Sequence, residues 1–111
     1  MINRFSHEFN ASVTVCDKEG VIIYMNRKAA ELYASFGGME LMGKNLLECH
    51  SEKTRERIRH MLQTPVENHY TTEKNGVKKY VAQLPWFENG RHMGIVEIVT
   101  FIPSDMPHFV R

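Results

Sequence analysis

The first strong pattern in the chain is an alternation of hydrophobic and polar residues that predicts two short strands joined by a tight turn. Val13 and Val15 occupy alternate positions of the first strand, and residues 21–25 form the returning strand. Between them, Asp17 can accept hydrogen bonds from its own turn, and Gly20 can adopt the positive φ that closes it. We therefore expect an antiparallel hairpin here.

A helix is predicted directly after this hairpin. Asn26 can accept a hydrogen bond from the free backbone N–H groups of the first helical turn, so the helix begins after it and covers residues 27–36. The two glycines at 37–38 end the helix, and residues 40–42 and 45–49 are each long enough for a single turn. The expected apolar face of the helix consists of Ala29, Leu32, Tyr33 and Phe36.

A longer helix is predicted over residues 52–63. Ser51 is its expected N-cap, and Pro65 prevents its continuation. One face carries four residues at helical spacing, and His60 lies roughly opposite them. These four residues are Thr54, Ile58, Met61 and Leu62.

From residue 66 onward the hydrophobic period changes to two, which is typical of strands. Residues 75–76 and 89–90 both read Asn-Gly, a strong signal for two-residue hairpin turns. Three strands in a meander, added to the first two, predict an α+β fold. We expect a five-stranded antiparallel sheet with short helices packed on one face.

The N-terminal residues carry an apolar stripe of their own. Ile2, Phe5 and Phe9 recur at helical spacing, so we expect an amphipathic helix over residues 1–10. Such a stripe needs a cover, either the outer face of the sheet or a second copy, and we therefore predict a homodimer. The expected organisation is this cap at 1–10, one domain at 11–103 and a tail at 104–111.

Composition excludes several classes of function. The chain of 111 residues suits a single domain without a separate output domain. Its 14 basic and 13 acidic residues are interspersed, so no electrostatic signal for nucleic-acid binding is present. No apolar stretch has the length of a membrane span or signal peptide, and we expect a cytoplasmic protein with Cys16 and Cys49 as reduced thiols.

The strand, turn, strand and Asn-capped helix at residues 13–30 resemble the opening of a PAS domain. Residues 43–47, Gly-Lys-Asn-Leu-Leu, are similar to the Gly-x-Asn-hydrophobic segment of the PAS helical region. Residues 73–77 resemble the hairpin between the third and fourth PAS strands, and residues 94–99 resemble the last strand. The resemblance covers roughly residues 11–103. It implies a sheet whose last strand pairs with the first, enclosing a pocket, and a sensory or protein-interaction role.

Two further features allow a comparison with particular kinds of PAS protein. The Cys49-His50 pair and the tail at residues 106–109 are similar to small bacterial one-domain PAS proteins and to the PAS segment of some hemerythrin-like proteins. Flavin photochemistry of the light-oxygen-voltage type requires Gly-x-Asn-Cys. Leu46 stands where that cysteine would be, so a flavin is not expected.

Heme is an alternative cofactor, because several PAS sensors hold iron through a histidine on the third helix. The corresponding position here is Thr54, and His60 points away. Imidazole, thiolate and thioether side chains all ligate heme iron. The possible heme ligands are Cys49, His50, His92 and Met61.

Metal and enzyme chemistry have little support in the sequence. Nothing completes four zinc ligands around Cys49 and His50, and no hydrolase, nucleotide-binding or dinucleotide-binding signature is present. Direct activation of Cys49 by His50 is awkward, since adjacent residues on a helix point about 100° apart. We expect neither a bound metal nor catalysis.

Candidate pocket residues are mostly large, soft or aromatic, and the alternative is that they fill the core. Glu97 lies among apolar residues on the last strand, which predicts either a buried partner such as Arg91 or His92 or an exposed docking surface. The function that follows is a sensory module that binds a small ligand or a partner protein. The alternatives are a heme-binding PAS protein and a ligand-free interaction domain. The pocket candidates are Met25, Cys49, Thr54, Ile58, Met61, Tyr80, Trp86 and Met93.

Overall fold

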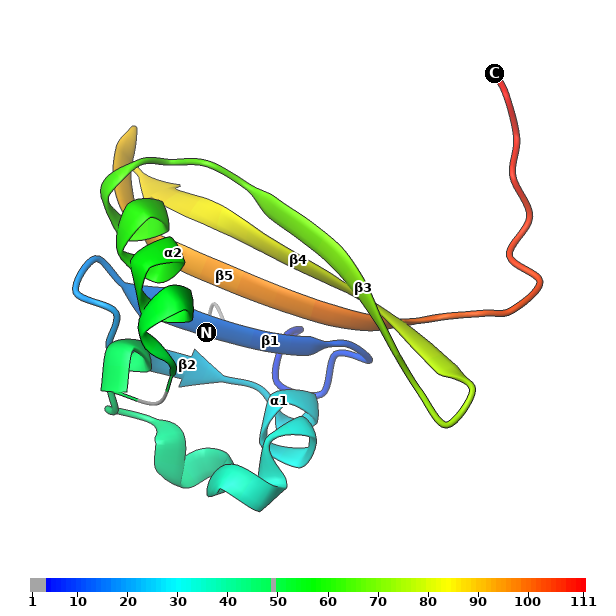
Figure 1. Ribbon diagram of the computed structural model, residues 1–111, viewed down its shortest axis with the longest axis horizontal. Coiled ribbons are helices and arrows are strands. Elements are labelled where there is room, and N and C mark those ends of the chain that lie inside the picture. The colour runs from blue at the N-terminus through cyan, green and yellow to red at the C-terminus, as the bar shows by residue number, and fades with distance from the viewer. Residues whose placement is uncertain (1–3, 49) are drawn as a thin grey trace.

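The computed structural model of the protein describes residues 4–48 and 50–111. They form an antiparallel sheet of five strands in the order β2-β1-β5-β4-β3, with the helices on one face (Figure 1). This arrangement confirms the predicted α+β fold. The strands are β1 (Ser12–Asp17), β2 (Ile22–Met25), β3 (Asn68–Lys74), β4 (Val77–Glu88) and β5 (Arg91–Ile102).

The helices lie in the connection between β2 and β3. The predicted helix over residues 27–36 is divided, since α1 ends at Leu32 and a 3-10 turn follows before Gly37 reverses the chain at φ +118°. The longer helix and its Ser51 N-cap are confirmed. The α-helices are α1 (Arg27–Leu32) and α2 (Glu52–Gln63), and the 3-10 turns are Ala34–Phe36, Gly38–Leu41 and Leu46–Glu48. None of the described helices is long and apolar enough to cross a membrane.

The β1–β2 hairpin has the predicted chemistry. The Oδ1 atom of Asp17 accepts from the backbone N of Glu19 at 2.9 Å and of Val21 at 3.0 Å, and Gly20 has φ +88°. Asn45, from the Gly-x-Asn segment, donates its side-chain amide to the Glu19 carbonyl at 2.9 Å. The helical connection is therefore fastened to the tip of the first hairpin.

Asn26 links three separate parts of the chain. Its Oδ1 atom accepts from the backbone N of Ala29, as a helix cap, and also from the backbone N of Val13. Its Nδ2 atom donates to the carbonyls of Ser6 and Ala11, at 3.0 and 2.8 Å. The side chain is fully buried. Asn26 therefore joins β1, α1 and the N-terminal segment in one polar cluster.

The N-terminal residues differ from the prediction. Residues 4–8 form turns and residues 9–10 have no helical structure, so the expected helix over 1–10 is wrong for the described part. The reason is tertiary, because Asn26 draws in the Ser6 carbonyl and the Ser6 hydroxyl lies 2.8 Å from that of Tyr24. Phe5 and Phe9 remain exposed and pack edge to face on each other. Ile2 lies outside the described residues.

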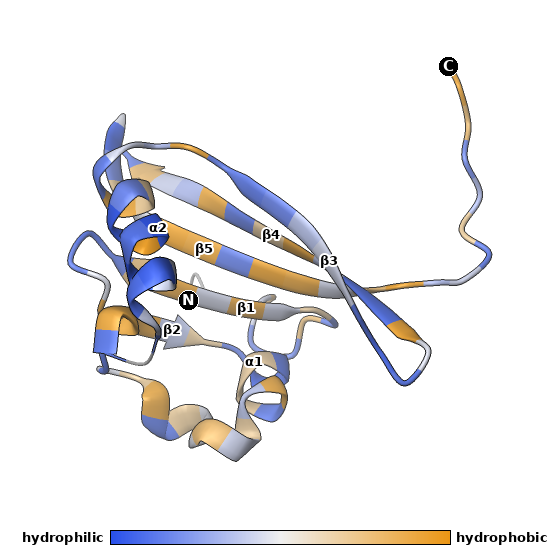
Figure 2. Ribbon diagram, in the orientation of Figure 1, coloured by the Kyte–Doolittle hydropathy of each residue, from blue (hydrophilic) through white to orange (hydrophobic). Residues whose placement is uncertain are grey.

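Both Asn-Gly hairpins are confirmed. Asn75 and Asn89 have φ 53°, and the glycine after each has φ 79°, which is the geometry of the turn that Asn-Gly favours. The β3–β4 pairing is regular, whereas the β4–β5 pairing shifts by one residue after Trp86. Most of β5 is hydrophobic, with a hydrophilic interruption near its middle, while β3 is mostly hydrophilic (Figure 2).

The core lies between the sheet and the helices. One cluster joins Met61 and Leu62 of α2 to Cys16 of β1 and Ile95 of β5. A second cluster joins α1 to β2 through Ile22, Met25 and Ala29. In Figure 1, α2 and α1 cover different parts of the sheet, and the C-terminal tail runs away from it.

Gly94 allows a very close approach of β1 and β5. A Cβ atom at this position would lie 2.0 Å from the backbone oxygen of Cys16, and Gly94 has φ +152°. The indole N–H of Trp86 donates to the same Cys16 oxygen at 2.9 Å. No residue with a side chain fits this position without displacing the backbone of β1.

Candidate functional site

An open cleft of about 620 Å³ lies on the helix side of the sheet, between the end of α1 and strands β3, β4 and β5. Its walls combine aliphatic side chains with two tyrosines, and charged residues surround its mouth. The lining residues are Leu32, Tyr33, Tyr70, Thr72, Glu73, Lys74, Asn75, Val77, Lys79, Val81, Glu97 and Val99.

Glu97 is held in this cleft by two neutral donors. The Tyr33 hydroxyl donates to its Oε1 atom at 2.5 Å, and the Gln83 amide donates to its Oε2 atom at 2.9 Å. The carbonyl oxygen of Gln83 accepts in turn from the side-chain amide of Asn68 at 2.9 Å. This second bond orients the Gln83 amide so that its N–H faces Glu97. The described residues provide no ion pair for Glu97.

The negative charge of Glu97 acts on both tyrosines of the cleft. Burial, followed by the charge of Glu97 and its hydrogen bond, raises the pKa of Tyr33 well above its ordinary value. Burial and the Glu97 charge also raise the pKa of Tyr70, while the nearby Arg57 guanidinium opposes this shift. Both phenols are therefore neutral donors at physiological pH.

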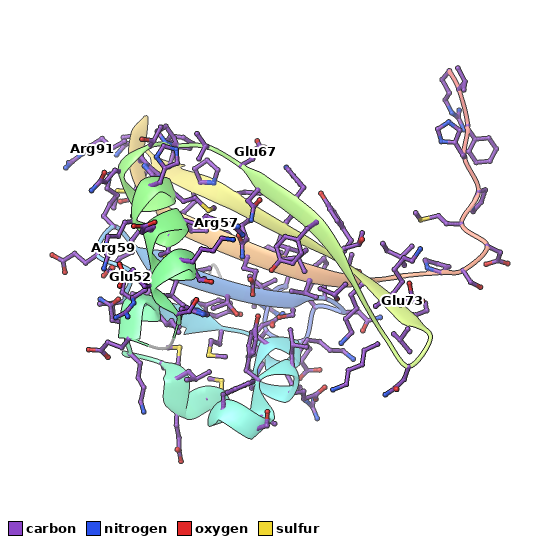
Figure 3. All side chains as sticks on the ribbon, in the orientation of Figure 1. Glu52, Arg57, Arg59, Glu67, Glu73 and Arg91 are labelled. Carbon is purple, nitrogen blue, oxygen red and sulfur yellow. The ribbon has the colours of Figure 1, made fainter. Side chains whose placement is uncertain are left out.

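The charged residues around the cleft come from different elements. Glu73 and Lys74 are at the end of β3, and Lys79 is on β4. In Figure 3, Arg57 extends from α2 over the strands, whereas Glu52 and Arg59 lie on the other side of the helix. The latter two form an exposed ion pair of 3.3 Å.

A second, smaller hollow continues from this cleft toward the N-terminal segment. It has a volume of about 340 Å³ and shares Leu32, Lys79 and Val99 with the larger one. Ser12 and Asn10 lie on its other side. The cleft therefore reaches from the β3–β4 turn to the start of β1.

Glu97 has different partners from those expected. The sequence predicts that Glu97 has a buried partner, Arg91 or His92, or else lies on an exposed docking surface. In the structure its hydrogen-bond partners are Tyr33 and Gln83. Arg91 and His92 begin the same strand, and five residues of strand span about 16 Å, which is too far for contact.

Most of the predicted pocket residues lie elsewhere. Met25 and Met61 are buried in the core, and Ile58 packs against the cluster that contains Met61. Thr54 lies in the first turn of α2, where its hydroxyl accepts from that of Ser51. Cys49 lies outside the described residues.

The three remaining candidates are on β4 and β5. Strand register places Tyr80 and Trp86 on the face of the sheet away from the helices, because Gln83 and Val81 point into the cleft. Met93 is the extra residue of the β4–β5 irregularity. Tyr33, Tyr70 and Gln83 were not among the predicted site residues. The one sequence signal that pointed to this site was the charge of Glu97 among apolar neighbours.

The described residues that line the cleft do not fit heme. His92 is engaged through its Nε2 atom with the Gly94 carbonyl at 3.0 Å, Met61 is buried in the core and His50 is exposed. Among the described residues, the only lining groups that ligate heme iron in other proteins are the phenols of Tyr33 and Tyr70. Their raised pKa disfavours the phenolate that such ligation needs.

The described residues also lack a metal or thiol centre. No group of three or more His, Cys, Asp or Glu side chains is arranged to hold a metal ion within residues 4–48 and 50–111. Cys16 is a free thiol, and its burial raises its pKa to about 11. A buried neutral thiol is a poor nucleophile.

The five-stranded antiparallel sheet with helices on one face, and a cleft between them, define an α+β domain of one sheet and one helical layer. A family model for the PAS fold matches residues 6–102. The chain therefore belongs to the PAS fold family, as the sequence motifs indicated. Domains of this kind are generally sensory and non-catalytic. No curated protein sequence matches the chain significantly.

Solved structures with this fold include sensors of several kinds. The chain matches the Aer2 receptor of Vibrio cholerae, a dual PAS-heme oxygen sensor, with 20% identity and a TM-score of 0.61, over 84% of this chain and 95% of that one. It matches the PAS domain of BvgS from Bordetella pertussis with 16% identity and a TM-score of 0.63, over 94% and 85%. A C-terminal domain from Streptococcus mutans has 18% identity and a TM-score of 0.71, over 90% and 81%. At these identities the likeness concerns the fold.

Proposed function

We propose that this domain is a sensory module that binds a small ligand in the cleft between α1 and strands β3–β5. The observation that carries the proposal is the cleft itself, which has a volume of about 620 Å³ and a fixed polar group, Glu97, among apolar walls. Its volume is within the range of typical small-molecule sites. The domain would report occupancy by contact with another protein.

The position of α1 supports a route for the signal. Its C-terminal end supplies Leu32 and Tyr33 to the cleft, and its N-terminal end is capped by Asn26. Asn26 also holds the carbonyls of Ser6 and Ala11. A ligand that moves Tyr33 would therefore move a short rigid helix whose other end is fastened to the N-terminal segment.

A substitution at the edge of the cleft tests ligand binding. Val77 lines the cleft and is 43% exposed, so Val77→Trp should fill part of the space without disturbing the core. We expect small-molecule hits from an NMR fragment screen to shift the resonances of cleft residues in the wild type, and to lose at least about tenfold in affinity in this variant.

The matched control is the next residue of the same strand. Lys78 pairs with Ile102 and points to the opposite face, so Lys78→Trp should leave the affinities unchanged. Hits that bind elsewhere, or that bind Val77→Trp as well as the wild type, would contradict the proposed site. No hits at all would favour the ligand-free interaction domain.

We also propose that the outer face of the sheet and the N-terminal segment form a homodimer interface. The outward positions of the central strands are aliphatic and half-buried, among them Val15, Val96 and Ile98. Phe5 and Phe9 are 74% and 45% exposed and pair with each other next to this face. The contact between Ser6 and Tyr24, which lies on the outer face of β2, fastens the segment there. A second copy would cover these side chains.

The double variant Phe5→Ser/Phe9→Ser tests the dimer. We expect it to be monomeric by light scattering at concentrations where the wild type is dimeric, because it removes two exposed aromatic anchors from the interface. The control is Phe36→Ser/Met39→Ser, which removes residues of 73% and 49% exposure from the helix side. A double Phe variant that remained dimeric would disprove this use of the N-terminal segment.

A further inference from the structure

The bonding of Glu97 leaves part of its carboxylate available to a ligand. An ionised carboxylate has about four acceptor sites, and Tyr33 and Gln83 occupy two of them, one on each oxygen. Gln83 cannot turn away, because Asn68 fixes its amide. The free acceptor sites belong to a side chain that lines the cleft.

The charge of Glu97 lacks a counterion in the described part of the chain. Both of its donors are neutral, and none of the ion pairs formed by residues 4–48 and 50–111 includes it. A partly buried charge is costly unless it is paired, and a cationic donor would add the opposite charge that the two neutral donors do not supply. A bound cation would complete the site.

The walls beside Glu97 suit the rest of such a ligand. Tyr33 and Tyr70 enter the cleft from α1 and β3 and offer aromatic rings, which attract cations. Leu32, Val81 and Val99 supply aliphatic surface between them.

We propose, as a refinement that rests on the sensory function above, that the cleft binds a small organic ammonium ion. The ammonium group would donate to Glu97, and the apolar part of the ligand would pack against the Tyr33 and Tyr70 rings. The ligand class is then an amine with an aromatic or aliphatic body.

Basic side chains near the mouth of the cleft favour an anionic ligand instead. Lys74 and Lys79 line its mouth, and Arg57 is close enough to oppose the rise in the pKa of Tyr70. Lys79 is four residues along β4 from Gln83, about 13 Å away by strand rise, so it is remote from Glu97. These groups would bind a carboxylate ligand at the mouth, whereas Glu97 binds a cation farther in.

Three probes with the same ring distinguish these possibilities: benzylamine, benzyl alcohol and benzoate. NMR titration of the full chain should give shifts at Leu32, Tyr33 and Val99. Benzylamine should bind at least about tenfold more tightly than benzyl alcohol, and benzoate most weakly. Glu97→Gln should abolish the preference for the amine. Glu88→Gln removes the same charge from the exposed end of β4, outside the lining of the cleft, and should retain that preference.

A second variant covers the case in which Glu97→Gln does not fold. Tyr33→Phe keeps the ring but frees one acceptor site of Glu97, so the preference for benzylamine should persist or increase. A loss of the preference in Tyr33→Phe would overturn the inference. Equal binding of benzyl alcohol, or tighter binding of benzoate, would also overturn the ammonium assignment while leaving the cleft as a ligand site. Absence of cleft shifts with every probe would overturn both proposals.

Discussion

Gly94→Ala is expected to lower the free energy of unfolding by about 4 kcal/mol or more, which is a large fraction of the stability of an ordinary domain. The new Cβ would lie 2.0 Å from the Cys16 backbone oxygen, and a backbone atom cannot rotate away as a flexible side chain can. Separation of β1 from β5 would then break the pairing of the two central strands. Chemical denaturation followed by far-UV circular dichroism measures the loss.

Gly90→Ala is the matched control, because it tests backbone conformation without the contact. Gly90 lies in the turn between β4 and β5, has φ +79°, and has nothing within 4 Å of a Cβ. Its substitution should lower the free energy of unfolding by about 1–2 kcal/mol, the penalty for a left-handed residue other than glycine. If Gly94→Ala lost no more stability than this control, the close approach of β1 and β5 would be wrong.

Asn26→Ala is expected to lower the free energy of unfolding by about 3–5 kcal/mol. The substitution removes four hydrogen bonds and leaves the N–H groups of Val13 and Ala29 and the carbonyls of Ser6 and Ala11 without this partner. The site is fully buried, so water cannot easily replace the lost bonds. The measurement is again equilibrium denaturation.

Two comparisons separate the roles of Asn26. Ser51→Ala removes only an exposed helix cap, from α2, and should lower the free energy of unfolding by about 1 kcal/mol. Asn26→Asp keeps the acceptor for Val13 and Ala29 but cannot donate to Ser6 and Ala11. It should therefore release the N-terminal segment, which limited proteolysis would detect. A stability loss in Asn26→Ala equal to that of Ser51→Ala would show that the cap alone matters.

The partners of Glu97 show why the site was harder to predict than the fold. Counting outward from the turn at residues 89–90, a regular hairpin would place Gln83 opposite Val96. The irregularity at Trp86 and Phe87 shifts the pairing by one residue, so Gln83 lies opposite Glu97. A shift of one residue changes which side chains share a face. No local signal in the sequence reveals this shift, and it decides what fills the cleft.

Tyr33 illustrates the same limit on a helix. Its spacing with Ala29 and Leu32 predicts an apolar face, and Leu32 and Tyr33 do face the sheet. Its hydroxyl, however, bonds to a carboxylate 64 residues away in the sequence. The pattern gives the direction of the side chain but not the partner.

Residue types and their spacing were sufficient to predict the local structures: both Asn-Gly hairpins, the Gly20 turn, the Asn26 and Ser51 helix caps, and through their order the PAS fold. Each depends on interactions within a few residues, so residue type and spacing are sufficient. The same patterns did not predict the surroundings of Glu97, the nonhelical conformation of residues 4–10 or the faces of Tyr80 and Trp86. These depend on strand register and on contacts between distant segments, which a local pattern does not encode.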